Sequence, residues 1–141
     1  QKPFLEDHNI SIINNITEPI HVYVDSLRIE EVFKNLITNS VKYTPDTGGT
    51  ITLSAKEKEK FVEVSISDTG IGMTKDQLAK IFDEFYRADS STHGADSVGL
   101  GLSITKRIIL KHKGRIWAKS KGPNKGSTFY FTLPKDKGGI E

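Results

Sequence analysis

The chain has 141 residues, of which 35% are hydrophobic and 27% are charged, and it contains no cysteine. This length and this balance of residue types are typical of one soluble globular domain, and they exclude a disordered chain. The absence of cysteine excludes a disulfide scaffold and a cysteine nucleophile. No stretch approaches the ~18 consecutive apolar residues of a transmembrane helix, and the first residues lack the pattern of a secretory signal peptide.

The net charge of +2 conceals two regions of opposite sign. Residues 1–105 carry 10 basic and 16 acidic side chains, a net charge of −6, whereas residues 106–141 carry 10 basic and 2 acidic side chains, a net charge of +8. A basic region can face nucleic acid, a phosphate ligand or an acidic partner, and composition alone does not choose among them.

The first part of the chain predicts strands followed by one long helix. Residues 10–16 are rich in β-branched side chains, and residues 21–25 alternate in the manner of a short strand. Ser26 is expected to cap an amphipathic helix that ends near Tyr43, before Pro45.

A hairpin and a second helix come next. Strands are predicted at residues 50–55 and 61–67, with a solvated loop at residues 56–60. Thr74 with Gln77 predicts a capping box, which is the start signal of a helix. The apolar stripe of this helix consists of Leu78, Ile81, Phe82 and Phe85.

A polar loop and a second hairpin complete the pattern. Residues 87–98 are small and polar without an apolar period, and a loop of that length is more often functional than decorative. A third helix is expected to start near Gly99 and to end at Gly114, before strands at residues 115–120 and 127–133.

This order predicts an α/β fold, a two-layer α/β sandwich with a mixed, largely antiparallel sheet and about three helices on one face. We divide the chain into an N-terminal lead-in (residues 1–19), one domain (residues 20–134) and a C-terminal tail (residues 135–141).

One polar group lies on the long helix. Asn35, Asn39 and, roughly, Lys42 share one face, because residues four apart are helical neighbours. Two amide oxygens and an ammonium group can serve a hydrated Mg²⁺ ion and a polyphosphate. The alternative is a polar flank beside an apolar stripe.

A second group follows a strand. Asp68 offers only acceptors, so it can receive the amino group of adenine but would repel the keto oxygen of guanine. Gly70 and Gly72 would let a flat ring approach the backbone. The alternative is a β-turn with two glycines.

The third group is residues 99–103, Gly-Leu-Gly-Leu-Ser, at a predicted helix start. Free N–H groups and the helix dipole favour phosphate at such a position. The alternative is a flexible start of the helix.

In this order the motifs resemble the catalytic ATP-binding domain of sensor histidine kinases, within the GHKL superfamily (gyrase, Hsp90, histidine kinase and MutL). The resemblance covers about residues 20–134. The matching segments are residues 35–45 (the N box), 68–72 (G1), 82–87 (F), 99–103 (G2) and 126–129 (the last turn before the final strand). It implies a Bergerat fold.

The resemblance also implies roles for single residues. Asp68 would hold the adenine amino group, with Gly70 and Gly72 leaving room for the base and Tyr43 lying against the base or ribose. Asn39, with Asn35 beside it, would hold Mg²⁺. The residues expected near the phosphates are Lys42, Arg87, Gly99, Leu100, Gly101 and Thr128, with residues 88–98 as the ATP lid. Phe82 and Phe85 would pack in the core and couple the lid to it.

Asn35 separates this chain from the ATP-hydrolysing members of the superfamily. Those members place a glutamate there to activate water, and a neutral amide is a poor general base. We therefore expect Asn35, Lys42 and Arg87 to form the catalytic set for transfer of the γ-phosphoryl group from Mg–ATP to another acceptor. Glu31, one turn earlier, is expected on the surface.

The resemblance implies an acceptor histidine on a dimerisation hairpin of the parent kinase. None of the four histidines lies in the expected context, so we expect the hairpin to be absent from this chain. Further expectations are a monomer, a cytoplasmic location, a response regulator downstream, and no contact with nucleic acid or membrane. The membrane status of the parent protein stays open. The alternatives are a GHKL-type protein serine kinase and a non-enzymatic nucleotide-binding module.

Overall fold

The computed structural model describes residues 9–16, 20–45, 47–83 and 101–135. The elements in chain order are β1 (Ile10–Asn14), α2 (Ser26–Lys42), β2 (Gly49–Glu57), β3 (Phe61–Asp68), α3 (Lys75–Lys80), α4 (Gly101–Lys111), β4 (Ile116–Lys119) and β5 (Ser127–Pro134). Among these residues, no helix combines the length and the apolar character needed to cross a bilayer.

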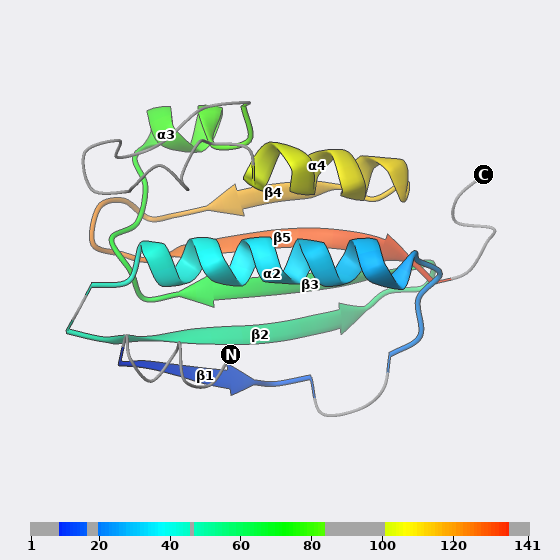
Figure 1. Ribbon diagram of the computed structural model, residues 1–141, viewed down its shortest axis with the longest axis horizontal. Helices are drawn as coiled ribbons and strands as arrows, with labels where there is room; N and C mark the ends of the chain where they lie inside the picture. Colours follow the sequence, from blue (N-terminus) through cyan, green and yellow to red (C-terminus); the bar gives the residue numbers. More distant parts are fainter. Residues whose placement is uncertain (1–8, 17–19, 46, 84–100, 136–141) are drawn as a thin grey trace.

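The strands form one sheet in the order β1-β2-β3-β5-β4. β1 runs parallel to β2, and the other neighbouring strands are antiparallel. Figure 1 shows α2 and α4 side by side across one face of this sheet, running in opposite directions, with α3 toward the end where α4 begins. This arrangement confirms the predicted two-layer fold with a mixed, largely antiparallel sheet.

The core lies between the sheet and the two long helices. Alternate residues of β3 and β5 point toward the helices, and the central ones are Val64, Ile66, Phe129 and Phe131. Phe33 of α2 meets Phe131 edge to face, with ring centroids 5.5 Å apart. Each fully buried large side chain of this kind contributes roughly 1.5–3 kcal/mol.

β1 attaches part of the expected lead-in segment to the sheet. It pairs with β2 from Ile10 opposite Gly49 to Asn14 opposite Leu53, and Ile10 belongs to the buried core. Residues 10–14 are therefore an edge strand of the same sheet.

The predicted cap of α2 is wrong by one residue. Asp25 is the N-cap, and its Oδ1 accepts from the backbone N–H groups of Leu27 (3.1 Å) and Arg28 (3.3 Å). Ser26 is the first helical residue. The aspartate and the serine are both good caps, and Asp25 is the one with extended backbone at this position.

The strand predicted at residues 21–25 is absent. The segment keeps its alternation, since Val22 and Val24 pack against the core while Tyr23 is exposed. Its backbone meets the end of β5, where Tyr23 N–H donates to Pro134 C=O at 2.9 Å. Alternating burial thus arises here without a ladder of strand hydrogen bonds.

The first hairpin is longer than predicted, because β2 extends to Glu57 in the charged loop. Lys56 lies opposite Glu63 and Glu57 opposite Val62 in the ladder. A pair of opposite charges across two strands stabilises the pairing, so charged residues can occupy the strand ends.

The capping box of α3 is confirmed. Thr74 Oγ1 accepts from Gln77 N–H at 3.2 Å, and Gln77 Oε1 accepts from Thr74 N–H at 2.8 Å. Ile81 and Phe82 follow the helix and pack in the core, where Phe82 meets Phe129 edge to face. Phe85 lies outside the described residues.

α4 ends in a left-handed turn at Lys113, not at Gly114 as predicted. Lys113 has a φ of 63°, and the N–H groups of Lys113 and Gly114 donate to the carbonyls of Leu110 (3.0 Å) and Ile109 (2.9 Å). These two bonds form a Schellman motif. Gly114 is required for another reason, because a side chain there would collide with the Thr132 carbonyl oxygen.

Candidate functional site

Asp68 ends β3 as a buried carboxylate with 7% of its surface exposed. Its Oδ1 accepts hydrogen bonds from Gly70 N–H (2.9 Å) and Ser127 N–H (3.3 Å). Both of these bonds are to Oδ1, and the backbone of the described residues makes no hydrogen bond to Oδ2. The backbone thus fixes the carboxylate through one oxygen and leaves the other to accept from a ligand.

Burial raises the pKa of Asp68, because the site removes water from the charged form. The hydrogen bonds from Gly70 and Ser127 and the nearby Ser40 hydroxyl lower the pKa in part. A donor that reached Oδ2 would stabilise the charged form further.

Ser40 places an unsatisfied hydroxyl close to this carboxylate. Its side chain is fully buried, and its Oγ has no hydrogen-bond partner among the described residues. The hydroxyl lies near enough to the Asp68 carboxylate to lower its pKa. A buried hydroxyl without a partner costs about 1–3 kcal/mol, which indicates that a water or a ligand completes the site.

The glycines around Asp68 are required by the protein itself. A side chain at Gly70 would collide with the Tyr43 carbonyl oxygen, and one at Gly126 with the Asp68 carbonyl oxygen. Gly72 has a φ of 72° and packs against Gly122. Close packing of backbone on backbone thus explains Gly70 and Gly72 without a ligand, a reason that the sequence did not reveal.

Asn35 and Asn39 stand one turn apart on α2, as their spacing predicts. The Asn35 amide donates to Thr105 Oγ1 at 3.2 Å and to the Gly101 carbonyl oxygen at 3.4 Å, so it faces the first turn of α4. Asn39 is half-buried, and its side chain forms no hydrogen bond to the described residues. The two asparagines therefore differ, because the NH₂ group of one is engaged and the other has free ligand oxygen.

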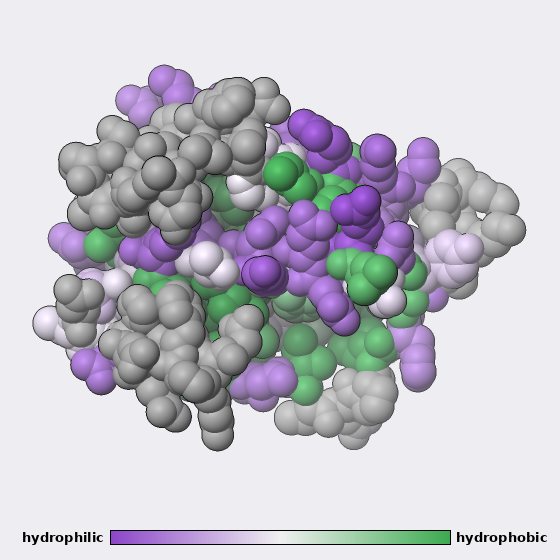
Figure 2. All heavy atoms as spheres, in the orientation of Figure 1, coloured by the Kyte–Doolittle hydropathy of each residue, from purple (hydrophilic) through white to green (hydrophobic). Residues whose placement is uncertain are grey.

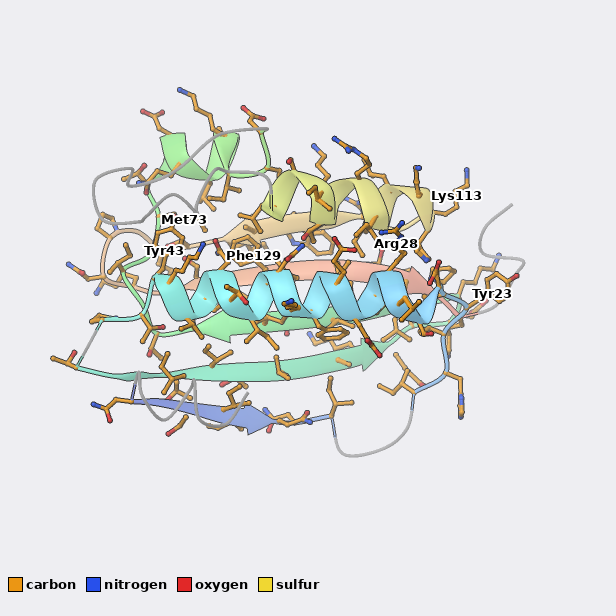
Figure 3. All side chains as sticks on the ribbon, viewed as in Figure 1. Tyr23, Arg28, Tyr43, Met73, Lys113 and Phe129 are labelled. Atoms are coloured by element: carbon orange, nitrogen blue, oxygen red, sulfur yellow. The ribbon has the colours of Figure 1, made fainter. Side chains whose placement is uncertain are left out.

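Lys42 and Tyr43 lie at the C-terminal end of α2 and are half-buried. The Tyr43 carbonyl accepts from Ile71 N–H at 3.0 Å, which ties the end of α2 to the turn after Asp68. Figure 3 shows Tyr43 and Met73 toward the same end of the molecule. The structure thus brings the C-terminal end of α2 and the turn after Asp68 together.

Gly101 is the first residue of α4, and no described atom would meet a side chain added there. Packing therefore gives no reason for this glycine, in contrast to Gly70. The predicted site residues Arg87, Gly99 and Leu100, together with residues 88–98, lie outside the described residues.

The structure does not bring Thr128 to the site. Its hydroxyl lies 2.9 Å from Ser67 Oγ, and both residues alternate with the core-facing positions Asp68 and Phe129. Because neighbouring residues of a strand face opposite sides, Thr128 does not share the face of Asp68, and the backbone N–H of Ser127 is the group that contacts Asp68.

Sequence reasoning missed Ser40, Thr105 and Ser127. Ser40 occupies a core position of the apolar stripe of α2, and a serine at such a position was the available signal. The alternation of β5 could have identified Ser127. Thr105 had no local signal, because its contact with Asn35 joins residues 70 apart in sequence.

Figure 2 shows mixed hydrophilic and hydrophobic surface on the face that carries α2 and α4.

Known proteins similar to this chain indicate its family. Residues 24–137 match the family model described as "Histidine kinase-, DNA gyrase B-, and HSP90-like ATPase".

Similar proteins carry kinase names. The chain is 37% identical over 132 residues to the sensor histidine kinase WalK of Bacillus subtilis, covering 92% of this chain and 21% of that protein. It is 47% identical over 116 residues to the adaptive-response sensory kinase SasA of Synechococcus elongatus, covering 80% of this chain and 29% of that protein. The chain thus spans about a fifth to a third of the curated relatives that it matches.

A solved structure with the same fold is the histidine kinase ThkA in complex with the response regulator protein TrrA. The TM-score is 0.77 at 28% sequence identity, and the match covers 96% of this chain and 37% of that chain.

Proposed function

Because the chain belongs to the family of histidine kinase-, DNA gyrase B- and HSP90-like ATPases, we propose that it is the ATP-binding catalytic domain of a two-component sensor histidine kinase. In this proposal the domain binds Mg–ATP beside Asp68 and donates the γ-phosphoryl group to a histidine of a separate hairpin domain. The observation that carries the proposal is the buried Asp68 carboxylate, held by the backbone through Oδ1 with Oδ2 left to accept.

The surroundings of Asp68 suit adenine. Oδ2 would accept from the 6-amino group, and the buried Ser40 hydroxyl would complete its hydrogen bonds at the edge of the base, directly or through a water. Guanine carries a carbonyl oxygen where adenine carries the amino group, so it would place an acceptor against a carboxylate.

The polar face of α2 suits the phosphates. Asn39 would hold Mg²⁺ through its amide oxygen, with Asn35 as the second candidate, and Lys42 would contact a phosphate. Bound Mg²⁺ would neutralise charge on the phosphates. Arg87, Gly99, Leu100 and Gly101 stay candidates for phosphate contacts by their place in the family motifs.

Transfer to a protein acceptor is favoured over hydrolysis. The Asn35 amide has no basic oxygen, and its NH₂ group already donates to α4. With no base to activate water, the residues here position the phosphates for in-line attack by a nucleophile from another domain.

Partners of the whole kinase are part of the same proposal. The acceptor hairpin would be the immediate partner, and a response regulator would act downstream, by analogy with the ThkA–TrrA complex. We place the domain in the cytoplasm as a monomer. The excess of positive charge after residue 105 would then lie near the triphosphate and would not bind nucleic acid.

Binding of a non-hydrolysable ATP analogue with Mg²⁺ to wild type and to Asp68→Asn tests the nucleotide site. Asparagine keeps Oδ1 for Gly70 and Ser127 but replaces Oδ2 by a donor that repels the amino group of adenine. We expect affinity to fall about ten- to a hundredfold, since hydrogen bonds to charged groups contribute about 1.5–3 kcal/mol. Equal affinity in the two proteins would refute the role of Asp68.

Mixing the domain with the hairpin of a candidate parent kinase and labelled ATP tests the transfer. The expected product is an acid-labile phosphohistidine on the hairpin, with little ATP turnover by the domain alone. An acid-stable phosphoserine would support the serine-kinase alternative, and binding without any transfer would support a nucleotide-binding module.

A further inference from the structure

The first turn of α4 is tied to the middle of α2 by one side chain. Asn35 Nδ2 donates to Thr105 Oγ1 at 3.2 Å and reaches the Gly101 carbonyl oxygen at 3.4 Å. Thr105 Oγ1 in turn donates to the same carbonyl oxygen at 2.7 Å. Two side chains, one from each helix, therefore converge on the carbonyl of the residue that begins α4.

The direction of this link is fixed by chemistry. A backbone carbonyl can only accept, and the single hydroxyl proton of Thr105 is already donated to it. Only the NH₂ end of the Asn35 amide can therefore face α4. The NH₂ group of the amide therefore acts as a donor toward the protein, and these bonds leave its Oδ1 unused.

The side chain of Thr105 is fully buried, and it makes hydrogen bonds with Asn35 and with the Gly101 carbonyl. A hydroxyl at such a position would cost stability if it had no partner, and Asn35 and Gly101 provide both of its hydrogen bonds. The link thus belongs to the packing of α2 on α4.

We propose that Asn35 is a positioning residue, which acts through Thr105 to hold the first turn of α4 at a fixed place relative to Asn39. The inference rests on the proposed function, in which the N–H groups of that turn and the Asn39 amide serve the same phosphates. In this inference Asn35 acts through its NH₂ group, and Mg²⁺ is assigned to Asn39, whose side chain makes no hydrogen bond to the described residues.

The opposite end of α4 shows why this link controls position more than folding. There Asp25 N–H donates to His112 Nε2 at 3.0 Å, while His112 Nδ1 lies 2.9 Å from the Ile108 carbonyl. α4 is therefore held to α2 at its C-terminal end as well. Loss of the Asn35 link frees only the first turn, where N–H groups act on a phosphate within one turn.

The decisive variants are Thr105→Val, which removes the hydroxyl at constant volume, and Asn35→Asp, which keeps an oxygen ligand but cannot donate. Both are made in the full chain and titrated with an ATP analogue at saturating Mg²⁺, and then with Mg²⁺ at fixed analogue. We expect each to weaken analogue binding about five- to tenfold. Asn35→Asp should not strengthen the apparent affinity for Mg²⁺.

The matched control is Thr132→Val. Thr132 is also a buried threonine, and its Oγ1 accepts from Arg115 N–H at 2.9 Å, far along the sheet from Asn35. Both threonine variants should lose similar stability toward urea, but Thr132→Val should bind the analogue as wild type does. Thr105→Ser, which retains the hydroxyl, should restore binding.

A double-mutant cycle of Asn35→Ala with Thr105→Val completes the test. If the two residues act through one link, the double variant should bind the ATP analogue no more weakly than whichever single variant binds it less tightly. Wild-type affinity in Thr105→Val, or stronger Mg²⁺ binding in Asn35→Asp, would overturn the inference. Failure of wild type to bind the analogue would instead refute the proposed function.

Discussion

At the end of β3 the backbone packs against itself, whereas at the start of α4 side chains hold the backbone in place. Around Asp68, three glycines leave no room for a side chain against neighbouring carbonyl oxygens or turns, and two N–H groups fix the carboxylate. Around Gly101 no described atom lies within 4 Å of an added side chain, and a link of two side chains holds the turn.

The difference suits two kinds of recognition. A base is flat and offers a fixed pattern of donors and acceptors, so a rigid carboxylate can select it. Phosphates are charged and mobile, and a helix end whose position depends on a few side-chain bonds can be adjusted by substitution without unfolding the domain.

The largest effect that would distinguish the end of β3 from the start of α4 is a loss of stability in Gly126→Ala. Gly126 has a φ of 74°, and its added methyl group would collide with the Asp68 carbonyl. We expect the free energy of unfolding to fall by about 3 kcal/mol or more, measured by urea denaturation.

Gly122→Ala is the matched control for backbone strain alone. Gly122 has a φ of 130°, but no atom of the described residues lies within 4 Å of the added methyl group. Its loss should stay near 1–2 kcal/mol. Equal losses in the two variants would mean that close packing at Asp68 adds nothing.

The sequence predicted the turn around Asp68, at the end of β3, better than the start of α4 around Gly101, for a physical reason. Asp68, Gly70 and Gly72 lie within five residues, and a turn of that kind is a local structure with a local signal. The helices and strands were equally accessible because their apolar periods are local. The ends of the helices and strands were harder to predict, as the shift of the α2 cap from Ser26 to Asp25 shows.

The link at the start of α4 could not be predicted from local pattern. It joins Asn35 to Thr105 across the fold, and neither residue departs from an ordinary helix sequence. The face of Thr128 was also not fixed by local pattern, because a one-residue shift in strand phase reverses the face of every side chain. Contacts between distant segments therefore account for most of what the sequence left open.

A second test uses the pH dependence of stability that Asp68, at the end of β3, contributes. Burial raises the pKa of Asp68 above its ordinary value of 3.8, so the folded state holds the proton more tightly than the unfolded chain. Its contribution to stability is therefore present below the ordinary pKa and is lost as pH rises through the raised pKa. Asp68→Asn should gain stability relative to wild type across that window.

Urea unfolding of wild type and Asp68→Asn from about pH 4 to pH 7 measures this difference. The exposed Asp83 supplies the control, since Asp83→Asn should show no such rise. A stability difference for Asp68→Asn that falls with pH would mean that the two backbone N–H groups outweigh the burial of the charge.

The C-terminal end of α4, where Figure 3 labels Lys113, gives a smaller effect on stability, of opposite sign for Lys113 and Lys111. Lys113 has a φ of 63°, which costs a side chain about 1 kcal/mol that glycine avoids. Lys113→Gly should therefore stabilise the domain by about 1 kcal/mol in thermal or urea unfolding. Lys111→Gly, within the helix, should lose about as much.

The smallest change in stability is expected at Gly101. An added methyl group meets no described atom there, and alanine favours helix, so Gly101→Ala should gain a few tenths of a kcal/mol. The same methyl group would lie at the helix end assigned to the phosphates, so affinity for an ATP analogue should fall several-fold. Calorimetric titration beside urea unfolding measures both quantities. A loss of stability as large as that of Gly126→Ala would show that the start of α4 is packed as tightly as the Asp68 turn, which would remove the contrast between the two ends.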